Sequence, residues 1–221
     1  MKLSFHRLFL TAALAIAAAA LPASAQNAPG TWELTPYGGV MFGQQIYQGG
    51  QNGRTTIDAD NAGTFGARIG YNLNRAFEVE FGYGHTSANL SGTNYPGIGG
   101  GEGKIGHLAM DSFELDGLFS WGNPRASGYV LLGAGAMMLD PSVSGVATSS
   151  STRFTWSFGV GGKFGITPNA AFRIEGRFRD TSLSNTTSSG VWCDYYYCYA
   201  YSTSWYANGE ITGGLTFQFG K

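Results

Sequence analysis

A histidine and a serine two positions apart, His85 and Ser87, have the types and spacing that most directly suggest catalysis. A histidine beside a serine can act as the base that activates the hydroxyl for attack on an acyl ester. Such a pair also needs an acid to orient the histidine, and none is evident in the surrounding sequence HTSANL. A histidine at the rim of the fold accounts for the same residues without chemistry, and we favour that interpretation.

The two cysteines of the sequence, Cys193 and Cys198, enclose a short segment near the end of the chain. In an exported protein, this spacing favours one disulfide that closes a small loop. A metal site would need further ligands. The two histidines that follow the N-terminal 25 residues, His85 and His107, are both far from the cysteines in sequence. We therefore expect a disulfide here, with no metal and no cofactor.

The elements that position such residues are clearest between residues 153 and 180. Apolar side chains alternate there with polar ones in two runs, the period-two pattern of strands with unlike faces. Residues 167–169, with the sequence TPN, separate the runs as a tight turn. The sequence therefore predicts a β-hairpin with an apolar side and a charged side.

Further runs of the same kind predict about eight strands in all. The six remaining strands are expected at residues 32–43, 65–73, 77–84, 113–121, 129–139 and 210–219. Pro36 cannot donate to a β-ladder, so the first strand either begins near Tyr37 or contains a bulge. Asp111 falls on the apolar side of its run, so that strand is expected to begin after it.

The strand at residues 129–139 is nearly all small or apolar. We expect Val130, Leu132 and Met138 to point outward, and Gly133 and Gly135 inward. The connections between strands alternate between short turns and long polar loops, the loops including residues 44–61, 140–152 and 181–204.

Residues 1–25 are expected to be a secretory signal. Lys2 and Arg7 precede an apolar run, which ends at the small-residue site Ala23-Ser24-Ala25. Residues 26–221 then form one domain. Without Lys2 and Arg7, the 13 basic residues become 11 against 14 acidic ones, a formal charge of −3. We therefore expect no nucleic-acid partner.

Alternating strands fit either a soluble sandwich or a membrane barrel. Glycine accounts for 35 of the 221 residues, more than twice its usual share of about 7%. Charged residues make up only 12% of the sequence, against a usual share of about 25%. No later apolar run approaches the roughly 20 residues of a spanning helix, so insertion would require a closed barrel. An even strand count with alternating connection lengths predicts an all-β fold, an eight-stranded antiparallel up-and-down transmembrane β-barrel with periplasmic termini.

Three stretches, FGARIGYNLNRAFEVEFGYG, TPNAAFRIEGRFR and GGLTFQF, give the sequence a family resemblance. It resembles the small outer-membrane barrels of the OmpA-like, porin-family type over about residues 32–219. The resemblance implies Sec-type export, contact with the barrel-assembly machinery, and a place in the outer membrane of a Gram-negative bacterium among lipopolysaccharide and phospholipid. Gly220 and Lys221 follow the aromatic Phe219, which departs from the family. We also expect no peptidoglycan-binding domain of the kind that larger relatives carry, and so no role in anchoring to the cell wall.

The polar sides of the strands place charges of both signs in the barrel interior. They are Arg68, Glu78, Glu80, Glu114, Asp116, Lys163, Arg173, Glu175, Arg177, Arg179 and Glu210. Eight strands enclose a space that side chains can fill, so we expect ion pairs across a plugged lumen. The alternative is a narrow or gated path for small solutes.

The outer loops are the expected functional surface, above all the aromatic segment between the cysteines. Tyr195, Tyr196 and Tyr197 offer large contact area at low entropic cost, and could bind a host protein, a glycan or a phage. The alternative is an aromatic girdle at the lipid headgroups.

The expected function is therefore structural and interactive, without enzyme activity. One alternative is a small-solute porin. The second is a lipid A-modifying hydrolase, because outer-membrane lipid A deacylases look similar to this sequence at His85-Thr86-Ser87.

Overall fold

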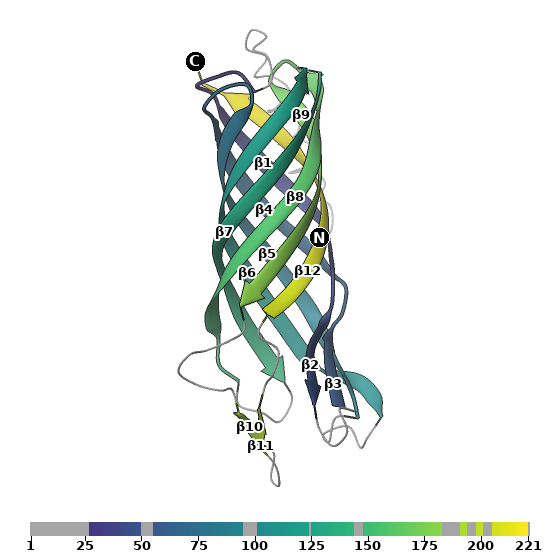
Figure 1. The fold of residues 1–221 in the computed structure, drawn as a ribbon. Coiled ribbons are helices and arrows are strands. Elements are labelled where there is room, and N and C mark those ends of the chain that lie inside the picture. Colours follow the sequence, from purple (N-terminus) through teal and green to yellow (C-terminus); the bar gives the residue numbers. More distant parts are fainter. Residues whose placement is uncertain are drawn as a thin grey trace, which may run out of the picture.

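Eight tilted strands form the wall of a tall barrel (Figure 1). The computed structural model describes residues 27–49, 55–94, 101–123, 125–143, 148–182, 191–193, 198–200 and 205–220. The wall strands are β1 (Trp32–Phe42), β4 (Ala62–Asn72), β5 (Phe77–Thr93), β6 (Glu102–Asn123), β7 (Ala126–Val143), β8 (Ser151–Thr167), β9 (Ala170–Ser182) and β12 (Trp205–Phe219). In these ranges, no helix is long and apolar enough to cross a membrane.

The ring closes because β1 pairs with both β4 and β12. Every other wall strand pairs with its neighbours along the wall, always antiparallel. The predicted eight-stranded antiparallel up-and-down barrel is confirmed. Trp32 pairs with Tyr71 and Phe219, so the first and last wall strands meet at the rim that carries the short turns. We call this the short-turn rim and the opposite end the loop end.

Asparagine side chains fix two of the short turns. The Oδ1 of Asn74 accepts hydrogen bonds from the amides of Ala76 and Phe77, at 2.8 and 3.0 Å. Asn123 does the same for Arg125 and Ala126, at 2.9 and 3.1 Å. Asparagine favours such turns because its side chain can satisfy backbone donors that the ladder leaves unpaired.

Toward the loop end, the strands run well beyond their predicted bounds. Residues 44–61 are not only a loop, because they contain β2 (Gln45–Gly49) and β3 (Thr55–Ala59), which pair with each other. β3 also pairs with the far end of β5, so this hairpin extends the wall. The expected start of the fourth strand after Asp111 is wrong too, since β6 begins at Glu102.

Both alternatives expected for Pro36 are wrong. β1 begins at Trp32 and runs through Pro36 without a shift of register toward β12. The chain accommodates the proline through Gly214 on β12, where a Cβ would lie 2.6 Å from the Pro36 carbonyl oxygen. The hydroxyls of Thr35 and Thr216 are hydrogen-bonded at 2.8 Å beside it and link the two strands through side chains.

The segment with the cysteines forms a separate two-stranded sheet, β10 (Val191–Cys193) and β11 (Cys198–Ala200). Cys193 lies directly opposite Cys198 in its register. Directly opposite residues of an antiparallel pair have Cα atoms about 4.5–5.5 Å apart, a range that disulfides also span. The disulfide stays a prediction, and Tyr195, Tyr196 and Tyr197 lie outside the described residues.

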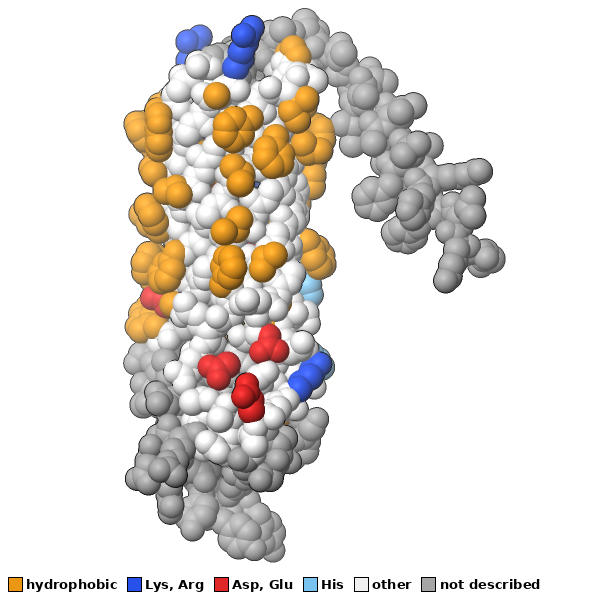
Figure 2. Space-filling model, turned by 90° about the vertical axis from the view of Figure 1, so that its right-hand side faces the viewer, with side chains coloured by type: hydrophobic (Ala, Val, Ile, Leu, Met, Phe, Trp, Pro, Cys, Tyr) orange, Lys and Arg blue, Asp and Glu red, His pale blue; other side chains and the backbone are white. Residues whose placement is uncertain are grey.

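The polarity of the wall reverses along its height, as β5 shows. From the short-turn rim to the loop end, its outward side chains are those of Phe77, Val79, Phe81, Tyr83, His85, Ser87 and Asn89. Its inward positions are Glu78, Glu80, Gly82, Gly84, Thr86, Ala88 and Leu90. The strand is therefore apolar outside and charged inside at one end, and polar outside and apolar inside at the other. Figure 2 shows the outward apolar side chains as an orange belt, with charged side chains on the wall beyond it.

At the loop end, the barrel is filled by an apolar layer. Its buried members are Met41, Ala59, Ala88, Leu90, Ile105, Leu108, Met110, Met137, Leu139 and Tyr206. β7 contributes to this layer because Met137 and Leu139 point inward, while Leu132 and Met138 point outward as predicted. The belt and the layer thus lie at different heights of the barrel.

Candidate functional site

The charged part of the interior, which we call the lumen network, contains all eleven inward charges expected from the sequence, together with Glu33. Each of these residues is buried, with at most 5% of its surface exposed. β9 supplies four of them in succession, because alternate residues of a strand share one face. These are Arg173, Glu175, Arg177 and Arg179.

Nearest the short-turn rim, Lys163 on β8 joins two carboxylates from across the barrel. Its Nζ lies 2.5 Å from Glu33 on β1 and 2.7 Å from Glu78 on β5. The amide of Asn72 also donates to Glu33, at 2.9 Å. One ammonium thus ties together strands that are not neighbours in the wall.

In the middle of the network, Arg173 is the central cation. Its guanidinium forms two hydrogen bonds with Glu80, at 2.5 and 3.2 Å, and a third with Glu175 at 2.7 Å. Its Nε donates to the Tyr129 hydroxyl at 2.7 Å, which itself donates to Glu175 at 2.7 Å. Arg68 adds a second cation, 3.0 Å from Glu175. Paired, forked contacts of this kind are the strong ion pairs of proteins.

Toward the apolar layer, Arg177 and Arg179 share a carboxylate. Arg177 lies 2.8 Å from Glu114 and from Asp116, and 2.9 Å from Glu175. Arg179 lies 2.9 Å from Glu114 and 3.0 Å from Glu210. These contacts join β6, β9 and β12.

The lumen network holds five cationic side chains and seven carboxylates, counting Glu33 with the six acids expected from the sequence. Its ion pairs form a nearly continuous series along the barrel axis, from Lys163 to Arg179. Charged groups buried this deeply are stable only when paired and hydrogen-bonded. These ion pairs therefore connect wall strands to one another across the lumen. Among the described residues, no group of three or more His, Cys, Asp or Glu could hold a metal ion.

Sequence reasoning missed two members of this interior. Glu33 stands between the outward Trp32 and Leu34, so its inward direction was available from the alternation. Tyr129 also falls on the inward side of its predicted strand, but nothing in the sequence indicated that its hydroxyl would join the charged groups. Its hydroxyl is placed in the network only by the contacts with Arg173 and Glu175.

Comparison with known proteins agrees with this geometry. The model of the outer membrane protein beta-barrel domain family matches residues 11–219. The chain belongs to this family. It is an outer-membrane barrel of a Gram-negative bacterium, and the predicted family type and location are confirmed.

Solved barrels with the same fold have very different sequences. OprG from Pseudomonas aeruginosa is 11% identical with a TM-score of 0.59, covering 88% of this chain and 99% of its own. Neisserial surface protein A is 11% identical with a TM-score of 0.55, covering 89% and 99%. The N-terminal barrel domain of P. aeruginosa OprF is 15% identical with a TM-score of 0.50, covering 86% and 98%. No curated protein matches the sequence.

On the outer wall of the barrel, the structure supplies the acid that the sequence did not reveal for His85. Asp111 on β6 lies opposite His85 on β5, and its Oδ1 is 2.8 Å from the histidine Nδ1. The Tyr83 hydroxyl donates to the same oxygen at 2.8 Å. Ser87 points outward on the same strand, but among the described residues no hydrogen bond joins it to His85.

This cluster lies where the outward face of the barrel changes from apolar to polar. Phe81 and Phe113 precede it on the apolar side, and Asn89 and His107 follow on the polar side. Tyrosine and other amphipathic rings favour the boundary between hydrocarbon and water. The cluster therefore marks the outer edge of the membrane-facing belt.

Proposed function

We propose that this outer-membrane barrel is closed to solutes, that it has a structural role, and that its loop end is a surface for interaction. The observation that carries the proposal is the lumen network, whose ion pairs cross the barrel between strands far apart in the wall. The interior of an eight-stranded barrel is only wide enough for side chains to fill. The apolar layer adds a second closure, since apolar constrictions exclude ions and water.

The alternative, a small-solute porin, is tested by recording single barrels in a planar lipid bilayer. We expect no steady conductance steps from the native protein, with insertion checked separately by flotation of proteoliposomes. A matched variant that combines Arg173→Ser with Met110→Ser removes one large side chain from the network and one from the layer, and should conduct. Regular, reproducible steps from the native protein would overturn the closed-lumen proposal.

The interaction surface is supported by the loop end itself. β2 with β3 and β10 with β11 lie at this end of the barrel (Figure 1), where the outward wall is polar. We propose that Tyr195, Tyr196 and Tyr197 bind a host protein, a glycan or a phage, because tyrosine provides large contact area at low entropic cost.

Binding is tested with cells that display the native barrel or a variant with all three tyrosines changed to serine. Adhesion to host cells, glycan arrays and phage adsorption are measured, with heat-modifiable gel mobility as the check that the barrel is folded. We expect the variant to lose binding. Equal binding by both proteins would remove the tyrosines from the proposal.

A second candidate function, hydrolysis of acyl esters in lipid A, is favoured by the His85–Asp111 pair alone. In that reaction, Ser87 would attack the ester carbonyl while His85 takes its proton and passes it to the alcohol as the ester C–O bond breaks. Water would then release the fatty acid from Ser87, with His85 again as the base. Mass spectrometry of lipid A tests it in cells with the native protein, with Ser87→Ala, and with Asn89→Ala as the matched outward control. An acyl pattern that is the same in all three, and the same without the protein, would exclude this function.

A further inference from the structure

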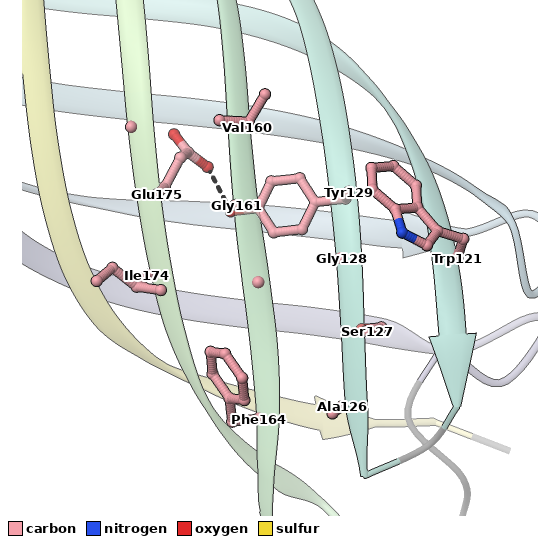
Figure 3. Close-up of a pocket in the computed structure, with 12 residues that line it drawn as sticks. Trp121, Ala126, Ser127, Gly128, Tyr129, Val160, Gly161, Phe164, Ile174 and Glu175 are labelled. Atoms are coloured by element: carbon pink, nitrogen blue, oxygen red, sulfur yellow. Dashed lines mark hydrogen bonds between the residues drawn. The ribbon is translucent and has the colours of Figure 1, made fainter.

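The wall facing the membrane has a groove near the short-turn rim. It has a volume of about 520 Å³ and extends over β6 to β9. Its apolar sides are formed by Trp121, Val160, Phe164 and Ile174 (Figure 3). These four side chains belong to the outward, exposed set of the barrel, so the groove opens toward lipid. Tyr129 and Glu175 of the lumen network also belong to its lining.

Glycines line the groove, and one of them leaves its floor open. A Cβ at Gly128 would lie 3.1 Å from the ring of Trp121, and a Cβ at Gly162 would lie 3.2 Å from the ring of Phe164. The two rings therefore lie over these positions. At Gly176 a Cβ would have nothing within 4 Å. The groove is thus unfilled at Gly176, where the backbone of β9 forms its floor.

A cation stands where the groove reaches the rim. Arg125 in the turn between β6 and β7 is exposed and precedes Ala126, which lines the groove. No ion pair of Arg125 occurs within the described part of the chain. An acyl chain in the groove would bring its own headgroup to the height of Arg125. Apolar sides with a cation at the headgroup end are complementary to a lipid with a phosphate.

We propose that this groove binds one acyl chain of an anionic phospholipid from the periplasmic leaflet, with the phosphate at Arg125. The short-turn rim faces the periplasm in barrels of this kind, which selects that leaflet. A second copy of the barrel is a poorer occupant, because a stable protein interface takes roughly 20–30 residues from each side, whereas 12 residues line the groove. The proposal does not depend on whether the lumen is closed.

Native mass spectrometry of the detergent-purified barrel tests the proposal. The protein is mixed with phosphatidylglycerol or with phosphatidylcholine of the same acyl chains, and the lipid retained per barrel is measured. We expect one phosphatidylglycerol on the native barrel and severalfold less on Gly176→Leu, whose side chain fills the groove. Gly63→Leu is the matched control, because Gly63 also has nothing within 4 Å of a Cβ and lies outside the groove.

The headgroup contact is tested with Arg125→Gln, a surface change in a turn that leaves the groove intact. We expect this variant to retain phosphatidylglycerol and phosphatidylcholine equally. Retention of phosphatidylglycerol on Gly176→Leu at the native level would overturn the acyl-chain site, and an undiminished preference for phosphatidylglycerol in Arg125→Gln would overturn the phosphate contact. A dimer that Gly176→Leu abolishes would assign the groove to a second barrel instead.

Discussion

Replacing Arg177 by methionine should leave one buried carboxylate in the lumen without an ion-pair partner. Arg177 contacts Glu114, Asp116 and Glu175. Glu114 would keep Arg179, and Glu175 would keep its other two cations. Within the described residues, Asp116 has no other ion pair, and its Oδ1 already lacks a hydrogen-bond partner. The loss of stability should therefore come mainly from Asp116.

The magnitude follows from leaving that charge buried. Removing one partner of a buried ion pair costs about 3–5 kcal/mol, and Asp116 is only 1% exposed. Asp116→Asn alone should cost less, about 1 kcal/mol, because the amide can still accept a hydrogen bond from Arg177. In the double variant, Asp116 is replaced by a neutral residue, so the loss of Arg177 leaves no unpaired charge at that position. Its cost should fall below the sum of the two single costs by about 2 kcal/mol.

Equilibrium unfolding in urea measures these free energies, with the barrel in lipid vesicles and tryptophan fluorescence as the signal. Arg125→Gln is the control for loss of an arginine, and as a surface change it should stay within about 0.5 kcal/mol of the native protein. Costs of Arg177→Met and Asp116→Asn that simply add, within about 0.5 kcal/mol, would refute the reasoning. The lumen network would then be a set of independent contacts.

Three further predictions concern the faces of the wall, the apolar layer and the cysteines. Phe158→Arg should cost about 2–4 kcal/mol in the same assay if the position lies near the bilayer midplane, whereas Ser157→Arg, on a buried inward position, should be limited by space; refolding of Phe158→Arg without loss would show that the faces are assigned wrongly. Leu108→Ala should cost about 2–5 kcal/mol as a cavity in a packed layer, and a loss under about 1 kcal/mol would mean that the layer is not tightly packed. Cys193 and Cys198 should resist alkylation until a reductant is added, and labelling without reductant would disprove the disulfide.

The architecture was predictable because the membrane part of each strand has two unlike faces. Phe158 and Phe172, for example, stand on the apolar parity of their runs, and both are exposed in the structure. The same alternation placed Arg173 and Lys163 inside without any knowledge of their contacts. Which charge meets which was not predictable, because it depends on the tilt of the strands and on pairings across the lumen between residues such as Lys163 and Glu33.

The strand ends were missed for a physical reason. The predicted strands stopped where polar residues appeared on the apolar parity, as at His85 and Asp111. In the structure both strands continue past these residues, and only the surroundings of the wall change. Asp111 is stable on the outer wall because His85 and Tyr83 both bind its carboxylate. A polar residue on the outward side therefore marked the end of the apolar belt and not the end of a strand.

The reversal of polarity follows from what the outside of the barrel touches at each height. Within the belt, lipid already surrounds the outward apolar side chains, and moving such a side chain from lipid into the lumen would gain almost nothing. Cohesion of the interior there has to come from polar contacts such as that of Arg173 with Glu80. Beyond the belt, water surrounds the wall, so burying Leu108 and Met110 inside is favourable in the ordinary way. One continuous sheet thus contains a membrane barrel and a water-soluble barrel end to end, and each part has the interior that its solvent requires.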